Sequence, residues 1–494
     1  MKALKKIAGF AYCLLFFAAC TVPGAILFMP SDEDGTAEKR QLAEKPVFFS
    51  EDGTFNENFS AECLAYVSDH FGFRSQLVAA DAQAKSTLLH VSAEPKVTIG
   101  MDGWLYYTQT LKDAAGVPTV SELGIRNIVY NLEMSRDYAA SRNAELIVAI
   151  VPNKASIYSK YLPYYCRESG VSGNYGNLAA AVKETDLNWC DLYTPLHAAS
   201  LLPGDDYIYH KLDTHWNNKG ALIGCRVILD STGKEYNAFD DALFGAEITH
   251  DWEGDLQNML FPGSEVRDVQ YTLPIEFTYQ YQGRFKDTDD LTINTMCAGA
   301  EGKLLMFRDS FARAAIPFLS ENFASARYCR ARPNPYYNLE NEQFDYVVTE
   351  IAERNIAWLQ KEAPMHAAPA AEPLPEPHVR KPGTIYTAQN GAMYLQIYGT
   401  LELPEDLDTA CDYVVTLTAP DGAQQHYLAY HCYESDLLGE EEIGDNGYSL
   451  YVPTENLTPG TEYQVSLAFR APRQIIGYDL GTVSLTAPET AAAE

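Results

Sequence analysis

The stretch "GKLLMFRDSFARAAIPFLSENFASARYCR" (residues 302–330) predicts a strand, a helix and a second strand in direct succession. The apolar run at 302–307 is short and continuous, which is the pattern of a strand buried on both faces. A helix is expected over 311–323, and the β-prone run at 324–330 predicts the next strand. Strands that alternate with helices are typical of an α/β domain with a parallel sheet.

The same alternation continues on both sides of this unit. Further strands are predicted at 144–154, 187–193 and 344–351, and further helices at 59–89, 124–142 and 217–231. The run 96–108 predicts a hairpin, because Asp102-Gly103 is a favoured turn pair between two β-prone runs. We therefore predict an α/β layered domain with a mostly parallel sheet over residues 31–361.

A change of composition follows this predicted domain. Residues 362–383 are rich in Pro and Ala, which predicts a linker without a core element of its own. From residue 384 to 494, short β-prone runs are separated by turn residues, the pattern of an all-β sandwich. We expect a separate accessory module here, whose strand aromatics either bind sugar or serve as ordinary packing residues.

The first thirty residues resemble a targeting segment. Three lysines precede an apolar run that is longer than the about 20 residues needed to span a bilayer. Positive charge before the run keeps the N-terminus inside, so the rest of the chain is expected to be extracytoplasmic and anchored to the cell membrane. A cleaved signal peptide is the alternative, since Ala18-Ala19-Cys20 resembles a processing site. The apolar run continues to Met29, which favours an uncleaved anchor over 1–30.

Composition restricts the classes of partner. A net charge of −31 over 494 residues argues against nucleic acid, because phosphate contacts need clustered Lys and Arg. The ten cysteines include no CxxC pair, which is unfavourable for a zinc site. Cys166–Cys190 and Cys411–Cys432 are the nearest candidates for disulfides, and buried thiols are the alternative. We expect no cofactor and no bound metal.

Ser310 occupies the position that a nucleophilic serine takes in an α/β domain. It follows a predicted buried strand and precedes a predicted helix, where a sharp turn exposes Oγ and the helix N–H groups face a developing oxyanion. The alternative is a structural one, in which Asp309 or Ser310 only caps the helix.

The stretch "HKLDTHWNNKGA" (210–221) contains the remaining groups that such a serine requires. A serine hydroxyl needs a base such as His215, and the base needs a carboxylate such as Asp213 to set its tautomer. Trp216 is available to pack beside the imidazole. The alternatives are an ordinary loop histidine, a simple turn aspartate, or a metal site that includes His210, for which no fourth ligand stands out.

An ordered set of motifs resembles a known family, the SGNH-hydrolase-like proteins of polysaccharide O-acetylation, which include the periplasmic alginate O-acetyltransferases and the DHHW proteins. The central motifs are Asp-Thr-His-Trp (213–216), Gly-Asp-Leu (254–256) and Arg-Asp-Ser-Phe (308–311). Supporting matches are "SDHFGFRSQL" (68–77), "IGMDGWLYY" (99–107), "VPNKASIY" (151–158) and "TEIAERN" (349–355). Together they span most of residues 50–360 in the family's order.

The resemblance implies an SGNH-like core in which the Asp-x-His pair precedes the serine. It implies Ser310 as nucleophile, His215 as general base and Asp213 as the acid that orients it. Arg354 and Arg308 would lie near the acyl or sugar site, and Asn153 and Asn294 are candidates for oxyanion and substrate contacts. Members of the family act with a membrane-embedded O-acyltransferase that supplies acetyl groups, so we expect that partner together with a polysaccharide acceptor.

Two features depart from the family's pattern. Arg308 replaces the glycine that eases the turn before the serine, and the β module differs from the sugar-binding module expected of alginate proteins. The predicted function is O-acetyl transfer to an extracellular or cell-wall polysaccharide through an acetyl-serine. The alternatives are a carbohydrate acetyl esterase with the same triad and a non-catalytic surface protein that binds carbohydrate.

Overall fold

The computed structural model describes residues 91–485 except 167–172, 203, 205, 406, 408 and 434–443. Before residue 91 it describes 10–14, 16–18, 21, 42–49, 53–70, 80–81 and 83–85. Most of the predicted anchor over 1–30 therefore lies outside the described residues. Within the described part, no helix is both long and apolar enough to cross a membrane.

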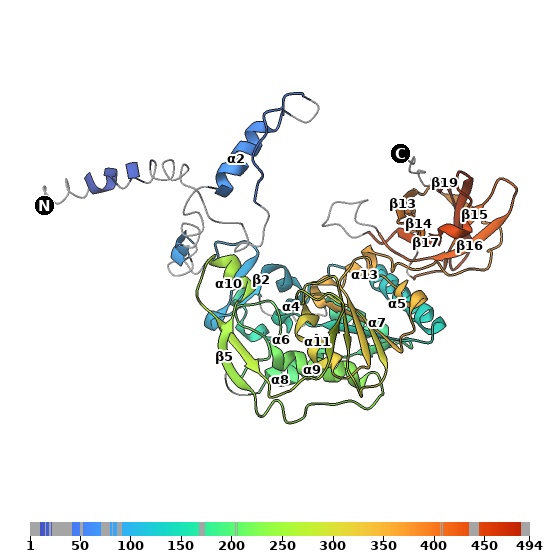
Figure 1. Cartoon of the computed structure of the whole chain (residues 1–494). Helices are drawn as coiled ribbons and strands as arrows, with labels where there is room; N and C mark the ends of the chain where they lie inside the picture. Colours follow the sequence, from blue (N-terminus) through green and yellow to red (C-terminus); the bar gives the residue numbers. More distant parts are fainter. Residues whose placement is uncertain are drawn as a thin grey trace, which may run out of the picture.

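A seven-stranded sheet with the order β4-β3-β11-β9-β10-β8-β7 forms the centre of the larger part of the molecule (Figure 1). Its strands are β3 (Glu145–Val151), β4 (Asn188–Cys190), β7 (Gln280–Gln282), β8 (Thr292–Met296), β9 (Lys303–Phe307), β10 (Ser325–Cys329) and β11 (Tyr346–Ala352). The five from β4 to β10 are parallel, whereas β8 runs antiparallel to both β10 and β7. The predicted mostly parallel sheet is confirmed, and β7 and β8 are strands that the sequence pattern did not reveal.

Helices cover both faces of this sheet, because alternate side chains of the parallel strands point to opposite faces. Leu304 and Met306 of β9 pack into one apolar cluster, and Leu305 and Phe307 pack into the other. The first face carries α6 (Lys154–Ile157), α8 (Tyr193–Ser200), α9 (Asn218–Asp230) and α11 (Ile316–Ser320). The second face carries α5 (Glu122–Ser141), α7 (Asn174–Val182) and α13 (Trp358–Lys361). The result is a three-layer α/β/α arrangement, which explains the continuous apolar runs in the sequence.

The helix predicted over 311–323 is not continuous. A 3₁₀ turn at Phe311–Ala314 is followed by the short helix α11. The break lies just before Pro317, which has no N–H to continue the helical hydrogen bonds. The predicted hairpin over 96–108 is confirmed, since β1 (Val97–Ile99) pairs antiparallel with β2 (Leu105–Tyr107) and Asp102 and Gly103 have positive φ in the turn between them.

The remaining elements of this part are short. They are α2 (Phe59–His70), α4 (Leu111–Ala114), β5 (Glu247–Trp252), α10 (Asp255–Leu260), β6 (Asp268–Thr272) and α12 (Asn338–Asn341). The helix predicted over 59–89 is confirmed at α2, and residues 71–79 lie outside the described part.

The C-terminal part is built from two sheets, with the orders β12-β19-β18-β15-β16 and β13-β14-β17. The strands are β12 (Val379–Lys381), β13 (Tyr386–Asn390), β14 (Tyr394–Thr400), β15 (Tyr413–Thr418), β16 (Gln424–Ala429), β17 (Gly447–Pro453), β18 (Glu462–Arg470) and β19 (Ile475–Ser484). Side chains from both sheets share one apolar core, which confirms the predicted β-sandwich. The Pro/Ala-rich stretch contributes β12 to this sandwich and buries Ala368 in its core.

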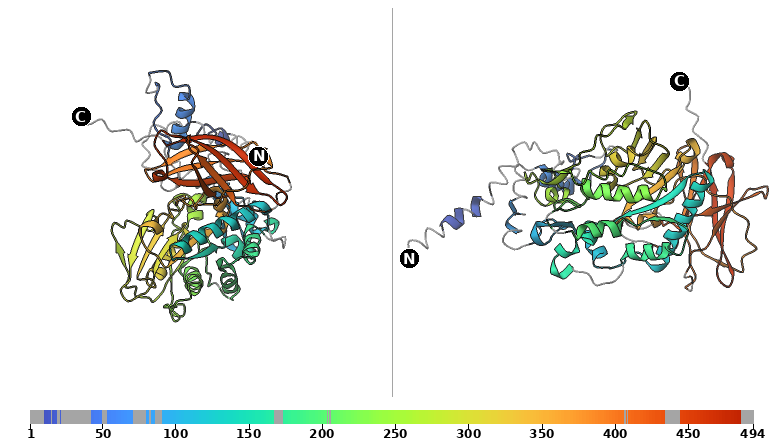
Figure 2. Two further views of the ribbon diagram at one scale, coloured as in Figure 1. Left: turned by 90° about the vertical axis from the view of Figure 1, so that its right-hand side faces the viewer. Right: turned by 90° about the horizontal axis from the view of Figure 1, so that it is seen from below.

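The sandwich packs against the α5 and α13 side of the α/β layers (Figures 1 and 2). Asn131 of α5 lies at the centre of the contact. Its amide donates to the carbonyl oxygens of His431 at 3.0 Å and Leu359 at 3.2 Å, and its oxygen accepts from the His431 N–H at 2.9 Å. The division into a catalytic domain over 31–361, a linker and an accessory domain over 384–494 stays a prediction.

The described part of the chain includes nine of the ten cysteines. Neither Cys166 and Cys190 nor Cys411 and Cys432 are joined by a disulfide bond in this part of the chain. Burial raises the pKa of Cys190 to about 12, so its thiol stays protonated and unreactive at neutral pH.

We predict that Asn131→Ala lowers the free energy of unfolding by about 2–4 kcal/mol, because buried backbone groups of His431 and Leu359 lose their partners. Chemical denaturation measures this change. Asp137→Ala, an exposed position on the same helix, is the control and should change the free energy by less than about 0.5 kcal/mol. Equal stability of both variants would contradict the tight packing of the sandwich on α5.

Candidate active site

Ser310 lies at the carboxyl end of β9, three residues after the last strand residue. The Asp309 carboxylate fixes this turn from the inside. It accepts the Phe311 N–H at 2.9 Å through one oxygen, and the Ala352 N–H at 2.8 Å and the Asn355 amide at 3.1 Å through the other. The turn that carries Ser310 is thus bound to the end of the neighbouring strand β11.

The replacement of glycine by Arg308 does not strain the turn. Arg308, Asp309 and Ser310 all avoid positive φ, and Ser310 has φ −74° and ψ −18°. Glycine is required only where φ is positive or where another backbone approaches closely. Arg308 can therefore occupy the position of the family's glycine in this turn.

Ser310, His215 and Asp213 form one row of hydrogen bonds. The distance from Ser310 Oγ to His215 Nε2 is 2.8 Å, and that from His215 Nδ1 to Asp213 Oδ1 is 2.7 Å. A carboxylate can only accept at this position, so Nδ1 carries the proton and Nε2 is left to accept the serine proton. The structure thus brings together the three residues that the sequence suggested for catalysis.

The Asp213 carboxylate accepts four hydrogen bonds. Oδ1 accepts from His215 Nδ1 and from the His215 N–H at 2.9 Å, and Oδ2 accepts from Trp252 Nε1 at 3.1 Å and the Asp255 N–H at 3.0 Å. Burial alone would raise the pKa of Asp213, but the interaction with His215 and these bonds outweigh it and hold the pKa well below the usual range. The group therefore remains ionised wherever the fold persists.

Lys154 holds the loop that carries Asp213 and His215. Its ammonium donates to the carbonyl oxygens of His210, Lys211 and Asp213 at 3.0, 2.9 and 2.6 Å. The side chain is only 3% exposed, and burial lowers its pKa to about 8. A buried charge of this kind is tolerated because each N–H has an acceptor.

Trp216 ties the same loop to the serine turn. Its indole N–H donates to the Phe311 carbonyl oxygen at 2.9 Å, and the ring is buried. The room for this ring comes from α9, where a Cβ at Gly224 would lie 2.7 Å from the indole. The ring beside the imidazole is that of Phe311, at 4.8 Å, whereas Trp216 was expected there.

Two carboxylates, those of Asp213 and Asp255, lie close to the His215 imidazole. The candidate ligand atoms of Asp213, His215 and Asp255 lie within 4.8 Å of one another. Asp255 also accepts the Thr214 N–H at 2.8 Å and the Thr214 hydroxyl at 2.7 Å. A cation would have to displace these donors. His210 was the other candidate ligand. Its ring stacks on that of Trp252, with 4.6 Å between the ring centroids, and its Nδ1 forms a hydrogen bond with the Val269 carbonyl oxygen.

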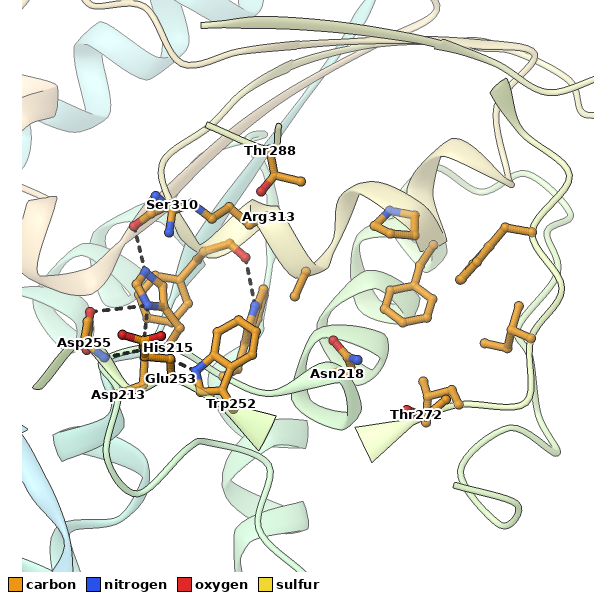
Figure 3. A pocket seen from close by; sticks show the side chains of 18 residues that line it. Asp213, His215, Asn218, Trp252, Glu253, Asp255, Thr272, Thr288, Ser310 and Arg313 are labelled. Carbon is orange, nitrogen blue, oxygen red and sulfur yellow. Dashed lines mark hydrogen bonds and ion pairs between the residues drawn. The ribbon is translucent and has the colours of Figure 1, made fainter. Parts of the chain in front are cut away.

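A cavity of about 700 Å³ opens beside Ser310 and His215 (Figure 3). Arg313 also lines it, three residues after the serine. One guanidinium nitrogen of Arg313 pairs with Asp289, while its buried Nε has no hydrogen-bond partner among the described residues. An unsatisfied donor in the wall of a cavity is a group that a ligand oxygen can satisfy.

The other predicted binding residues do not line this cavity. The Arg308 guanidinium donates to carbonyl oxygens of Thr288 and Asp290, so it holds the loop at the cavity rim. Arg354 lies over the far side of the Phe311 ring, at 5.2 Å. The substrate-binding roles of Arg308 and Arg354 stay predictions.

The two asparagine candidates are also used within the protein. The Asn153 amide donates to Asp113 at 2.9 Å, and its backbone N–H donates to Glu353 at 2.8 Å. Asn294 is on β8 and accepts from Arg327 at 2.9 Å. Neither lines the cavity beside Ser310.

Asp113 and Glu353 form an unusual acid pair around Asn153. Burial, together with the nearby Asp113, raises the pKa of Glu353 to about 8. Burial also raises the pKa of Asp113 to about 6, although the interaction with Arg354 opposes the rise. Of the two acids, Glu353 therefore holds its proton to the higher pH.

Sequence reasoning missed the groups that support the triad. Lys154 lies in "VPNKASIY" and Asp255 in Gly-Asp-Leu, motifs that were noted without a role for either residue. Trp252 precedes the second motif by two residues. A Cβ at Gly254 would lie 2.3 Å from the Leu212 carbonyl oxygen, so close packing explains that glycine.

The α/β/α layers and the hydrogen-bonded serine, histidine and aspartate are the arrangement that the resemblance to SGNH-hydrolase-like proteins predicts. Residues 97–294 match the family model described as SGNH hydrolase-like domain, acetyltransferase AlgX. Asp213 and His215 lie inside that stretch, and Ser310 follows it. The predicted resemblance to SGNH-hydrolase-like polysaccharide O-acetyltransferases is confirmed.

The chain is also similar to curated proteins that are described as probable alginate O-acetylases. The chain is 25% identical over 169 residues to the probable alginate O-acetylase AlgJ of Pseudomonas putida, covering 34% of this chain and 42% of that protein. It is 30% identical over 175 residues to the AlgJ of Pseudomonas fluorescens, covering 34% and 41%. The matches thus span less than half of the length of these relatives.

Solved structures provide more distant likenesses. The O-acetyltransferase domain of Pseudomonas putida AlgJ is 19% identical, covers 53% of this chain and 92% of its own, and has a TM-score of 0.35. Pseudomonas aeruginosa AlgX is 12% identical, covers 76% and 94%, and has a TM-score of 0.37.

We predict that Trp252→Phe slows the sulfonylation of Ser310 by phenylmethanesulfonyl fluoride about tenfold. The lost hydrogen bond to Asp213 is worth about 1.5 kcal/mol, and without it the carboxylate is no longer fixed toward His215. Intact mass spectrometry follows the reaction. Trp189→Phe, on β4 and outside the cavity, is the control, and equal rates in both variants would contradict an orienting role for Trp252.

We also predict that the free energy of unfolding of Glu353→Gln falls less steeply than that of wild type as the pH rises from 5 to 8. The folded-state pKa of Glu353 is raised to about 8, so unfolding releases a proton in this range and stability falls as pH rises. One such group changes the free energy by up to about 1.4 kcal/mol per pH unit, and less here because Asp113 shares the proton. Chemical denaturation at several pH values tests this, with the exposed Glu184→Gln as control; parallel curves for wild type and Glu353→Gln would refute it.

Proposed function

We propose that this protein is an O-acetyltransferase that acts on an extracellular or cell-wall polysaccharide. The observation that carries the proposal is the chain of hydrogen bonds Ser310–His215–Asp213, with 2.8 Å from serine Oγ to histidine Nε2 and 2.7 Å from histidine Nδ1 to aspartate Oδ1. Ser310 and His215 line a cavity that is large enough for a sugar. The match of residues 97–294 to an acetyltransferase family model supports the same reaction class.

In the first half-reaction, Ser310 Oγ attacks the carbonyl carbon of an acetyl ester while its proton moves to His215 Nε2. The negative charge of Asp213 stabilises the imidazolium that forms. The oxyanion accepts hydrogen bonds from the Ser310 N–H and from Arg313 Nε, each donor contributing roughly 3 kcal/mol. Collapse breaks the ester bond, and the leaving alcohol takes the proton from Nε2, which leaves an acetyl-serine.

In the second half-reaction, a sugar hydroxyl enters the cavity and gives its proton to His215 Nε2. Its oxygen attacks the acetyl-serine carbonyl, and the same donors hold the oxyanion. Ser310 leaves with the proton returned from Nε2. Water in place of the sugar gives hydrolysis, so the acceptor that reaches the cavity decides between transfer and esterase activity.

The supply of acetyl groups and the location of the protein follow from the same proposal. A membrane-embedded O-acyltransferase delivers the acetyl group, and residues 1–30 keep the protein at the extracytoplasmic face of the membrane. The similarity to probable alginate O-acetylases supports a polysaccharide as the acceptor.

We predict that Ser310→Ala and His215→Ala lower the release of 4-nitrophenol from 4-nitrophenyl acetate by at least about a thousandfold, because the nucleophile or its base is lost. Mass spectrometry of wild type should show an acetyl increment on the peptide that contains Ser310. With an oligosaccharide acceptor present, the acetyl increment should move to the sugar.

Three results separate the candidate functions. Acetylated sugar supports the transferase, and free acetate alone supports the esterase. Equal turnover by wild type and Ser310→Ala would rule out both enzymatic functions. Arg313→Lys tests the proposed oxyanion donor, since lysine keeps the charge but has no Nε–H donor at that position.

A further inference from the structure

The cavity beside the triad extends well beyond the reacting groups. An acetyl group fills roughly 60–90 Å³, two to three times the about 30 Å³ that one water occupies. The cavity volume is about 700 Å³. Most of the cavity is therefore available to a part of the substrate other than the acetyl group. The side chains that line this remaining space indicate the chemical nature of that part.

One wall continues directly from the nucleophile. Phe311, Ala314, Pro317 and Phe318 follow Ser310 along the 3₁₀ turn and α11, and all four line the cavity. Spacings of three and four residues put these side chains on one helical face. The eight steps from Ser310 to Phe318 cover roughly 12–16 Å at a rise of about 1.5–2 Å per residue.

The opposite wall is an extended segment that follows β6. Leu273, Ile275 and Phe277 line the cavity, whereas the alternate residues Pro274 and Glu276 are exposed. Alternation with a period of two means that one side of this segment is apolar throughout. Figure 3 shows the labelled triad residues at one end of the cavity and Thr272, next to this wall, at the other.

The far end of the cavity is closed by aromatic rings. Phe277 and Phe318 meet edge to face at 5.6 Å, and Phe239 packs on both at 6.1 Å. The charged groups of the lining, including Asp213, Asp255 and Arg313, are on or near the catalytic segments. Asn218, whose amide donates to the Tyr271 carbonyl oxygen, and Thr272 are the polar residues that line the cavity away from the triad, and the other side chains there are apolar (Figure 3).

We propose that this apolar half binds a linear alkyl chain of an ester substrate, of about six to ten carbons. An extended chain covers about 1.2 Å per bond, the value that an extended backbone has, so eight to ten carbons span roughly 10–12 Å. The chain belongs either to the acyl group or to the alcohol of the ester, and both share the same recognition. The inference rests on the proposed ester chemistry of Ser310 and extends it to substrates larger than acetyl.

Two series of esters test the proposal with the wild-type protein. One varies the acyl group from 4-nitrophenyl acetate to butyrate, hexanoate and octanoate, and the other varies the alcohol from ethyl to butyl, hexyl and octyl acetate. We expect kcat/KM, corrected for the rate of alkaline hydrolysis, to rise about twofold to fourfold per added methylene in one series. The series that rises identifies which part of the ester enters the apolar half.

A substitution in the wall sharpens the test. Ile275→Asn places an amide in the apolar wall and should lower the ratio of kcat/KM for the long ester to that for the short one about tenfold. Phe277→Ser, at a position 37% exposed, is the second variant should the first fail to fold. Glu276→Gln, whose exposed side chain belongs to the other side of the segment, is the matched control and should leave the ratio unchanged.

Failure of the alkyl-chain inference and failure of the proposed function give different experimental results. Flat profiles in both series, with acetate still turned over, would overturn the alkyl-chain inference and leave the acetyltransferase proposal intact. No turnover of any ester by wild type would overturn the proposed function. Calorimetry of Ser310→Ala with methyl hexanoate and methyl acetate then decides the inference, which requires at least tenfold tighter binding of the hexanoate.

Discussion

The four hydrogen bonds accepted by Asp213 are the constraint on which the rest of the site depends. They join three segments, because the donors come from the histidine loop, from Trp252 at the end of β5 and from Asp255 at the start of α10. A carboxylate with both oxygens held in this way cannot rotate. Its direction sets the plane of the imidazole, and the imidazole in turn sets where the serine proton goes.

The loop that carries this pair is held by buried polar groups. Lys154 donates to three carbonyl oxygens of this loop, of which that of Lys211 also accepts the Leu105 N–H, and its charge is compensated by the nearby Asp213. On the other side, Asp309 binds the serine turn to β11. Lys154 and Asp309 both follow the carboxyl ends of parallel strands. This edge of the sheet is where helices and loops meet and where α/β folds place their ligand sites.

The central features of the fold could be predicted because each has a local cause. Strand β9, α9 and the turn at Asp102 follow from hydrophobic period and turn chemistry. Strands β7 and β8 could not be predicted, because their short polar sequences gain stability only from pairing beside β10. The triad was found from residue types on suitable elements, whereas Lys154 and Trp252 act through contacts with residues distant in the sequence.

The electrostatics of the site restrict how an oxyanion can be stabilised. Carboxyl groups gather behind the nucleophile, with Asp213 and Asp309 ionised and Glu350 held largely protonated because burial raises its pKa. Each of these carboxyl groups interacts with a cation, since Lys154 acts on Asp213, Arg354 on Asp309 and Arg308 on Glu350. The charge that develops on a tetrahedral intermediate is therefore stabilised mainly by N–H donors that reach the oxyanion directly. Arg313 lines the cavity and its buried Nε has no hydrogen-bond partner among the described residues, whereas Arg308 is bound to carbonyl oxygens and Arg354 packs on Phe311.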